Sequence, residues 1–252
     1  MVYLDRGYIG CFEMADKASG ARQLTEYVEQ LKAAGHKRIV APINGDTWHS
    51  YRLVSWCGGE PVFPMEPQNP LWYNEVYTNC GFVPLKKYRS DKFSLENIEP
   101  PVFDNPSLTL RPFHPEDLPL IYSLSIQGFD DNFLYSGIGY EDFAALYQPV
   151  LPMIDSELLL IAEADGAPAG FMFSFAAGDR LILKSMATLP QYRNYGIGSL
   201  LMAQVLAAGR AKGLKTAIAA LMSDDNVSRK IVSKYGSELI REYTIYTLEV
   251  QT

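Results

Sequence analysis

The segment Leu181–Leu201 restricts the fold more than any other part of the sequence. It runs from a strand-like apolar stretch through Arg193-x-x-Gly196-x-Gly198 into a sequence typical of a helix, LLMAQVLAAGRAKG. Glycines let a ligand approach the backbone closely, and the first N–H groups of a helix, together with its macrodipole, favour an anion. The order of strand, glycine turn and helix therefore predicts a binding site for a phosphorylated cofactor.

The spacing of the glycines separates this turn from two other phosphate-binding signatures. Neither the dinucleotide pattern G-x-G-x-x-G nor the P-loop pattern G-x-x-x-x-G-K-[ST] is present there. Arg-x-x-Gly-x-Gly after a strand, followed by a second strand at Lys215–Met222 and then by Asp225-Asn226, resembles the GNAT N-acetyltransferase superfamily. This resemblance implies that the turn holds the pyrophosphate of acetyl-CoA, the co-substrate of the family.

Composition and charge exclude several classes of protein. The 252 residues are 48% hydrophobic and 20% charged, which is typical of a globular chain of one or two domains. A net charge of −7 argues against nucleic-acid and membrane partners. The three cysteines lack C-x-x-C spacing, which predicts free thiols and no metal site. With neither a leader-like start nor an apolar run of about 18 residues, we expect a cytoplasmic protein.

A segment rich in proline, residues 94–107, divides the chain near residue 100 and predicts a linker at residues 101–107. After it we expect a domain at residues 108–252. Its predicted elements are a strand at 108–111, helices at 118–124 and 140–146, strands at 158–164, 169–176 and 181–188, a helix at 199–211, a strand at 215–222, a helix at 226–235 and a final strand pair around 238–250. This order resembles that of the GNAT fold and implies an α/β (α+β) domain with a mixed central sheet flanked by helices.

Residues 1–100 repeat part of that order. A strand at 7–14, a helix at 21–34, a strand at 37–43, a helix at 71–79 and a strand to about residue 93 resemble the later elements of the same fold. The resemblance implies a tandem protein whose first domain is a partial, degenerate GNAT-like copy. Its counterpart of the glycine turn is Asp16–Ala21, where one glycine follows an acidic residue, so we predict that this half does not bind acetyl-CoA.

The resemblance also assigns cofactor contacts. The backbone of the turn would face the pyrophosphate, the end of the preceding strand would lie beside the pantetheine arm, and a backbone N–H of that strand would meet the thioester carbonyl. The residues assigned in this way are Met186, Ala187, Thr188, Arg193, Asn194, Tyr195, Gly196, Ile197, Gly198, Ser199 and Asn226. Core packing is an alternative role for Met186, as is helix N-capping for Asn226.

The sequence departs from the family at the general acid. Many members have a tyrosine four residues before the glycine that follows the last helix, but this position is Val232 here, and only the first half has such a residue, Tyr77. Tyr235 and Tyr243 are the candidates that remain. The strand at 181–188 offers Lys184 and no carboxylate. Other acidic residues qualify as a general base by chemistry alone: Glu163, Asp224, Asp225 and the pair Asp130 and Asp131.

The loop at residues 44–52 combines stacking surface, a titratable group and a fixed charge. Trp48, His49, Tyr51 and Arg52 either wall the acceptor pocket or belong to a loop whose aromatic residues pack the contact between the domains. The function that we infer is transfer of an acetyl group from acetyl-CoA to a primary amine of a small molecule. The alternatives are a CoA-binding module without catalysis and a protein or peptide N-acetyltransferase, and a homodimer remains an open expectation.

Overall fold

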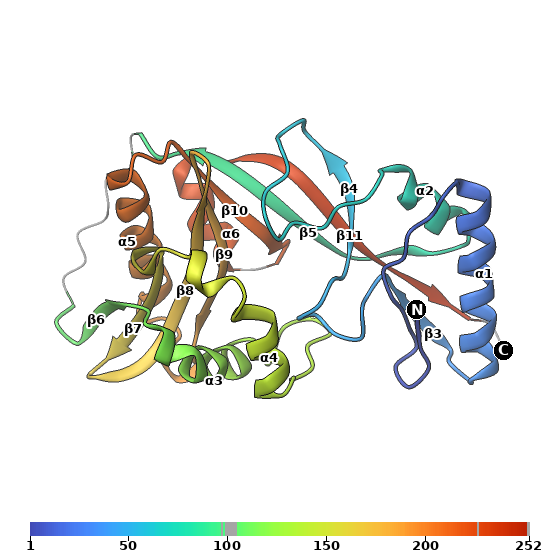
Figure 1. The fold of residues 1–252 in the computed structure, drawn as a ribbon, viewed down its shortest axis with the longest axis horizontal. Coiled ribbons are helices and arrows are strands. Elements are labelled where there is room, and N and C mark those ends of the chain that lie inside the picture. The colour runs from blue at the N-terminus through green and yellow to red at the C-terminus, as the bar shows by residue number, and fades with distance from the viewer. Residues whose placement is uncertain (97, 99–104, 226, 251–252) are drawn as a thin grey trace. The chain divides into compact units, whose positions relative to one another are not determined.

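The computed structural model describes residues 1–96, 98, 105–225 and 227–250 (Figure 1). The chain divides into two compact units. Unit 1 comprises Met1–Arg89 together with Leu239–Thr252, and unit 2 comprises Ser90–Glu238. One dividing point falls inside a long strand and the other at the start of a second long strand. We expected a single division, at a linker over residues 101–107. Residues 101–104 of that linker lie outside the described residues.

Two long strands explain why the division differs from the expected ranges 1–100 and 108–252. The first is β5 (Val83–Ser94), whose end belongs to unit 2 because Ser90 Oγ accepts the N–H of Leu221 at 3.0 Å and the N–H of Leu95, just after β5, bonds to Lys215 O at 2.9 Å. The second is β11 (Glu238–Glu249), which pairs antiparallel with strands of unit 1. Sequence patterns are local and carry no information on such long-range pairing.

Unit 2 is built on a mixed sheet in the order β10-β9-β8-β7-β6. Neighbouring strands are antiparallel except β9 and β10, which are parallel. The strands are β6 (Leu108–Pro112), β7 (Leu159–Ala164), β8 (Ala167–Ala177), β9 (Arg180–Thr188) and β10 (Thr216–Ser223). This arrangement confirms the predicted mixed sheet.

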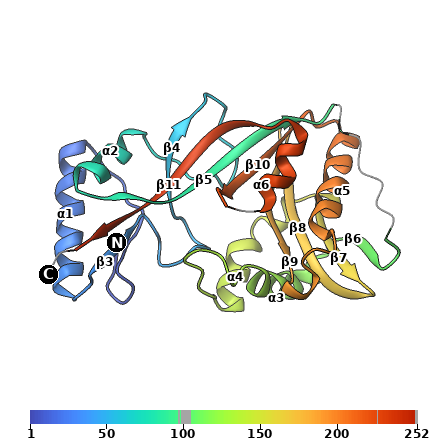
Figure 2. The ribbon, with the colours of Figure 1, turned by 180° about the vertical axis from the view of Figure 1, so that it is seen from behind.

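Helices cover both faces of this sheet (Figure 1). On one face lie α3 (Leu118–Gly128) and α4 (Tyr140–Tyr147). On the other lies α5 (Ile197–Ala211), and α6 (Val227–Val232) precedes β11 (Figure 2). The faces follow the alternation of β8, because Met172 belongs to the core formed with α5, whereas Phe171 and Phe173 line a cavity with α3 and α4.

The helical spacing read from the sequence matches the buried faces. On α3, Leu118, Ile121 and Leu124 are all buried, as their spacing predicts. On α5 the side chains of Leu201 and Val205 are fully buried against the strands. Burial of these apolar faces is the main stabilisation of the helices, since propensity alone is insufficient for helices of this length.

Unit 1 packs two helices against a small group of strands. These elements are β1 (Val2–Tyr3), β2 (Tyr8–Ile9), α1 (Lys17–Ala33), β3 (Arg38–Ala41), β4 (Leu53–Cys57) and α2 (Trp72–Asn79). Here β2 and β3 are parallel, and β11 runs antiparallel to both β3 and β4. The buried residues of α1 include Leu24, Val28 and Leu31, the face that the sequence predicts.

Four expectations for the strands and turns were wrong. The strand expected at residues 7–14 is only β2, because beyond it the N–H of Cys11 bonds to the side chain of Asn44 at 2.7 Å. The strand β4 lies where we expected a loop, and the final strand pair is the single strand β11. The expected turn Asp16–Ala21 is the start of α1, where Asp16 is the N-cap and accepts the N–H of Ser19 at 2.7 Å.

The described residues contain no helix that is both long enough and apolar enough to cross a bilayer.

Candidate functional site

The turn between β9 and α5 has the strand, turn and helix order predicted for it. After Thr188, a short 3₁₀ turn leads to Asn194 and Gly196, both in the left-handed region with φ of 73° and 82°. Gly196 is the N-cap of α5. Its left-handed backbone conformation favours a glycine at this position.

The N-terminus of α5 offers donors to an anion. Its N-cap, Gly196, has no side chain to accept the first N–H groups, and the first turn carries no acidic residue. The leading N–H groups of a helix have no partner within the helix, so those of Ile197, Gly198 and Ser199 point out of this end. Tyr195, just before it, is 55% exposed. This end of the helix therefore offers backbone N–H groups to an anion, whereas binding of a pyrophosphate here stays a prediction.

The arginine of the motif already has an anionic partner. Arg193 Nη1 and Nη2 lie 2.7 and 3.2 Å from the carboxylate oxygens of Asp131, in the segment between α3 and α4. The hydrogen bonds that Arg193 donates to the Asp131 carboxylate hold the pKa of Asp131 below its usual value and raise the pKa of Arg193. Because both side chains are largely exposed, solvent screens the pair and an entering anion can replace Asp131.

Beside the turn, β9 separates from β10. Their parallel register joins Arg180–Leu183 to Thr216–Ala219, but β9 continues to Thr188 and β10 to Ser223. Leu189 gives its N–H to Ala169 on the β8 side at 2.9 Å. Since hydrogen bonds alternate along an antiparallel pair, we infer that the N–H groups of Met186 and Thr188 point to the opposite edge, which has no register partner in β10 among the described residues.

The side chains at the end of β9 serve packing. Gly198 of α5 faces Met186, whose Cε lies 3.4 Å from the position a Cβ would take, and Ala187 is buried against Gly128 and Gly170. The backbone of this stretch, not its side chains, is therefore what a cofactor arm could contact. Asn226, the remaining predicted contact, lies outside the described residues.

The two candidate acids lie in different units. Tyr235 belongs to unit 2, where its ring stacks on Phe93 at 5.2 Å between centroids, and burial raises its pKa. Tyr243 belongs to unit 1, where it is fully buried and donates its hydroxyl to Glu66. Glu66 also binds Arg241 at 2.9 Å, so the hydroxyl of Tyr243 completes a buried ion-pair network. The structure thus gives Tyr243 a structural role and leaves Tyr235 as the candidate acid.

The candidate substrate loop is held by contacts inside unit 1. The carboxylate of Asp46 accepts the backbone N–H groups of Trp48 and His49 at 2.8 and 3.0 Å, and it also lies 2.9 Å from His49 Nδ1. The guanidinium of Arg52 lies between the rings of Tyr51 and Tyr88, at 3.9 and 4.1 Å from their centroids. Packing of the loop accounts for Tyr51 and Arg52, whereas an acceptor role for the loop stays a prediction.

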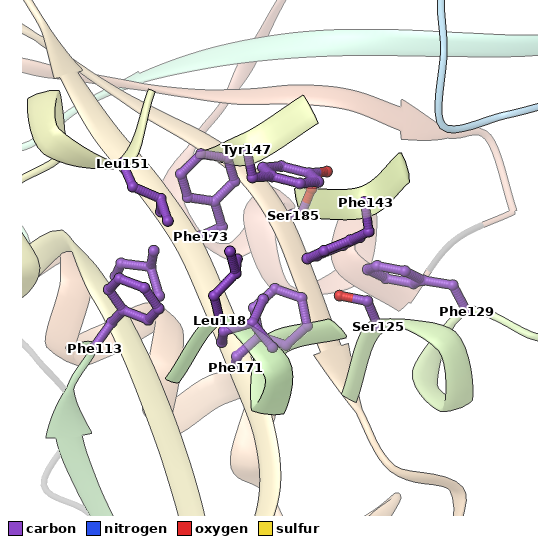
Figure 3. Close-up of a pocket in the computed structure, with 12 residues that line it drawn as sticks. Phe113, Leu118, Ser125, Phe129, Phe143, Tyr147, Leu151, Phe171, Phe173 and Ser185 are labelled. Atoms are coloured by element: carbon purple, nitrogen blue, oxygen red, sulfur yellow. The ribbon is translucent and has the colours of Figure 1, made fainter. Parts of the chain in front are cut away.

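A cavity under α3 and α4 was not anticipated from the sequence. It has a volume of about 20 Å³, room for about one water molecule, between these helices and the β7–β9 face of the sheet (Figure 3). Six aromatic rings line it: Phe113, Phe129, Phe143, Tyr147, Phe171 and Phe173. The one feature of the sequence that could have indicated this cavity is the density of aromatic residues between 113 and 175. An ordinary hydrophobic core would show the same density.

Several solved structures share this fold. The chain is similar to a GCN5-related N-acetyltransferase from Sphaerobacter thermophilus, with a TM-score of 0.64 and 13% identity over 92% of this chain and 67% of the other. It is also similar to a tandem GNAT protein from the clavulanic acid biosynthesis pathway, with a TM-score of 0.56 and 12% identity over 95% of this chain and 72% of the other. A GCN5-related N-acetyltransferase from Kribbella flavida has a TM-score of 0.52 and 16% identity over 94% of this chain and 77% of the other. At such identities the likeness shows the fold alone. No curated protein matches the chain.

The family model described as Acetyltransferase (GNAT) family matches residues 129–236. The matched residues include β9, the turn, α5 and β10, which are the elements that form the separated strand edge and the anion-binding helix end. The sequence motif, the order of elements and the family model thus agree on the same part of the chain. Residues 129–236 therefore match the GNAT acetyltransferase family, and the match lies within unit 2.

Proposed function

We propose that unit 2 binds acetyl-CoA at the turn between β9 and α5 and transfers the acetyl group to a primary amine of a small molecule. The observation that carries this proposal is the position of the uncapped N-terminus of α5 beside the unpaired edge of β9. The N-terminus of α5 can bind a diphosphate, and the edge of β9 offers N–H groups to an extended arm that contains amides. Few other ligands require both features together.

Each group of the chain then has a defined task. The N–H groups of Gly198 and Ser199 bind the pyrophosphate oxygens, and Arg193 adds charge once it leaves Asp131. Acetyl-CoA supplies the acetyl thioester. The N–H of Met186 or Thr188 donates to its carbonyl oxygen, where negative charge develops during amine attack. The hydroxyl of Tyr235, whose pKa is raised by burial above the ordinary 10.0, is the proposed donor to the departing sulfur.

Calorimetry and a thiol assay test this proposal. Titration of the full chain with CoA, acetyl-CoA and, as a control, AMP should show binding of the first two with similar affinity and weaker binding of AMP. Ellman's reagent should then detect free CoA when acetyl-CoA is mixed with primary amines. Absence of both heat and thermal stabilisation with CoA would sink the cofactor assignment, because a ligand at about 100 times its Kd stabilises by about 2.7 kcal/mol.

One observation favours the alternative, a CoA-binding module without catalysis. Val232 is completely buried. It occupies the position at which many members of the family that the sequence resembles carry the tyrosine that acts as general acid. The same two measurements separate the alternatives: binding of acetyl-CoA without release of thiol, across amines that differ in size and charge, would support the module.

A further inference from the structure

Unit 1 contains a cleft that is much larger than the cavity under α3 and α4. Its volume is about 470 Å³, against about 20 Å³ for that cavity. Pockets that bind small molecules typically measure about 300–1,000 Å³, so the cleft has room for such a ligand. It lies between β4 and the segment 62–71, and all of the residues that line it belong to unit 1.

The segment 62–71 forms one wall of the cleft, and every third side chain of this segment anchors it to unit 1. Phe63 is 1% exposed and Glu66 is 7% exposed. The side-chain amide of Asn69 accepts the backbone N–H of Val54 at 2.7 Å and donates to the carbonyl oxygen of Val54 at 3.1 Å. Each of the three anchoring residues is followed by a proline, which restricts the backbone between them. A wall fixed in this way loses little conformational freedom when a ligand binds.

The rim of the cleft is apolar and open to solvent. Val62 is 47% exposed and Leu71 is 49% exposed, and Pro67 and Pro70 line the cleft between them. Transfer of apolar surface out of water drives binding, so this rim favours a ligand with an apolar body.

The floor of the cleft is a buried ion pair. The side chains of Arg241 and Glu66 are 5% and 1% exposed, and Arg241 Nε lies 2.9 Å from Glu66 Oε1. Arg241 Nη2 donates to the carbonyl oxygen of Glu60 at 2.9 Å, and Arg241 Nη1 donates to Cys57 Sγ. In the part of the chain that the structure describes, this sulfur is the one acceptor for the two N–H groups of Nη1, and a thiol sulfur is a weak acceptor. Since Cys57 and Arg241 both line the cleft, an N–H group of Nη1 is available to a ligand there.

The charges at the floor select against an ionic ligand. Glu66 neutralises Arg241, and among the described residues no other acidic or basic side chain lines the cleft. A further charge brought from water to this floor would have no partner of opposite sign, which is unfavourable. An uncharged carbonyl oxygen accepts the N–H of Arg241 and adds no charge, and hydrogen bonds from a charged donor are stronger than those between neutral groups.

We propose that this cleft binds an uncharged, apolar molecule that carries a carbonyl oxygen. The apolar body of the ligand lies against the rim, and its carbonyl oxygen accepts an N–H from Arg241 at the floor. The inference does not rest on the proposed function, because every residue of the cleft lies in unit 1 and the turn between β9 and α5 lies in unit 2. It gives a binding role to the half of the chain for which we predict no acetyl-CoA site.

The experiment follows the backbone amide signals of the isotopically labelled full chain by NMR. It uses three probes that share a benzene ring: acetophenone has an uncharged carbonyl, ethylbenzene has none, and benzoate has a negative charge. Shifts at Gln68 and Leu71 locate binding in the cleft, and titration gives each Kd. Val62→Trp fills the cleft from its rim. Val83→Trp is the matched control, since Val83 is 55% exposed in unit 1 and outside the lining. The melting temperature of each variant checks its folding.

We expect acetophenone to bind at least about tenfold more tightly than ethylbenzene or benzoate, because it alone offers an acceptor without a charge. Val62→Trp should weaken binding of acetophenone by about tenfold or more, whereas Val83→Trp should change it by less than about twofold. Equal binding of acetophenone and ethylbenzene would overturn the role of Arg241, and tightest binding of benzoate would make the cleft an anion site instead. If no probe shifts the signals of Gln68 and Leu71, or if both variants weaken binding equally, the cleft is not a binding site.

Discussion

The guanidinium of Arg193 is held by the carboxylate of Asp131 through two contacts of 2.7 and 3.2 Å. Arg193 opens the glycine motif, and Asp131 lies between the two helices that roof the aromatic cavity. In the structure the charge that the sequence analysis assigned to the pyrophosphate is therefore neutralised by the chain itself. A phosphate group must compete with Asp131 for this arginine.

This competition predicts that Asp131→Asn binds CoA more tightly than the parent chain, by up to about fivefold, the range expected for an exposed ion pair of up to about 1 kcal/mol. Isothermal titration at low and high salt checks it, and the affinity of the variant should fall more steeply with salt because Arg193 then meets the ligand directly. Asp130→Asn, which removes the neighbouring charge without a hydrogen bond to Arg193, is the control. Weaker binding by Asp131→Asn would instead show that Asp131 orients Arg193 for the ligand.

The two glycines of the motif should respond differently to a methyl group. Gly196→Ala should lower the free energy of unfolding by about 1–2 kcal/mol, because φ of 82° is strained for any residue with a Cβ. Gly198→Ala should leave it unchanged or slightly raised, since the new Cβ would meet Met186 at an ordinary contact distance of 3.4 Å and alanine favours a helix. Urea denaturation of both variants measures the difference. Equal losses would contradict the assignment of Gly196 to conformation and Gly198 to packing.

Substitution of tyrosine by phenylalanine separates the two candidate acids. Tyr235→Phe keeps the stack on Phe93, so we expect an unchanged melting temperature and a kcat lower by about 100-fold, the lower end of general acid contributions. Tyr243→Phe removes a hydrogen bond from the buried carboxylate of Glu66, so it should cost about 1–3 kcal/mol of stability. If Tyr235→Phe has full activity, its hydroxyl is not the proton donor.

The start of unit 2 contains an ion-pair cluster with a predictable pH response. Arg111 binds Asp117 at 2.7 and 2.9 Å and Glu163 at 2.9 Å, and its hydrogen bonds lower the pKa of Asp117 below the usual 3.8. A carboxyl group whose pKa is depressed in the folded state contributes stability above its unfolded pKa and loses it as the pH falls through the folded value. Asp117→Asn should therefore be less stable than the parent chain at pH 7 by about 1–3 kcal/mol.

This difference should shrink steadily as the pH is lowered below 3.8, because protonation removes the charge from the parent chain as well. Denaturation by urea between about pH 2.5 and pH 7, a range that brackets the transition, would follow it. A difference that stays constant over that range would show that the charge of Asp117 contributes nothing.

Most elements of unit 2 were predictable because their signals are local. The helix that carries Leu118, Ile121 and Leu124 and the strands on either side of the Asp165-Gly166 turn appear within a few residues of their expected bounds. In unit 1 the same reasoning failed at residues 7–14, where the backbone bonds to the side chain of Asn44 from a distant part of the chain. Pattern analysis cannot anticipate a contact of that kind.

The candidate site was likewise predictable only where its features depend on residues that are adjacent in the sequence. The sequence by itself determined the glycine turn, the helix after it and thereby the resemblance to the GNAT family, because a left-handed glycine and a helix N-terminus are encoded in adjacent residues. Only the tertiary structure decided that Arg193 is paired with Asp131, that β9 leaves β10 after Leu183, and that a bulge at Lys184 turns Ser185 into an aromatic cavity. These features depend on the register and packing of segments distant in sequence, and register is set by the whole sheet.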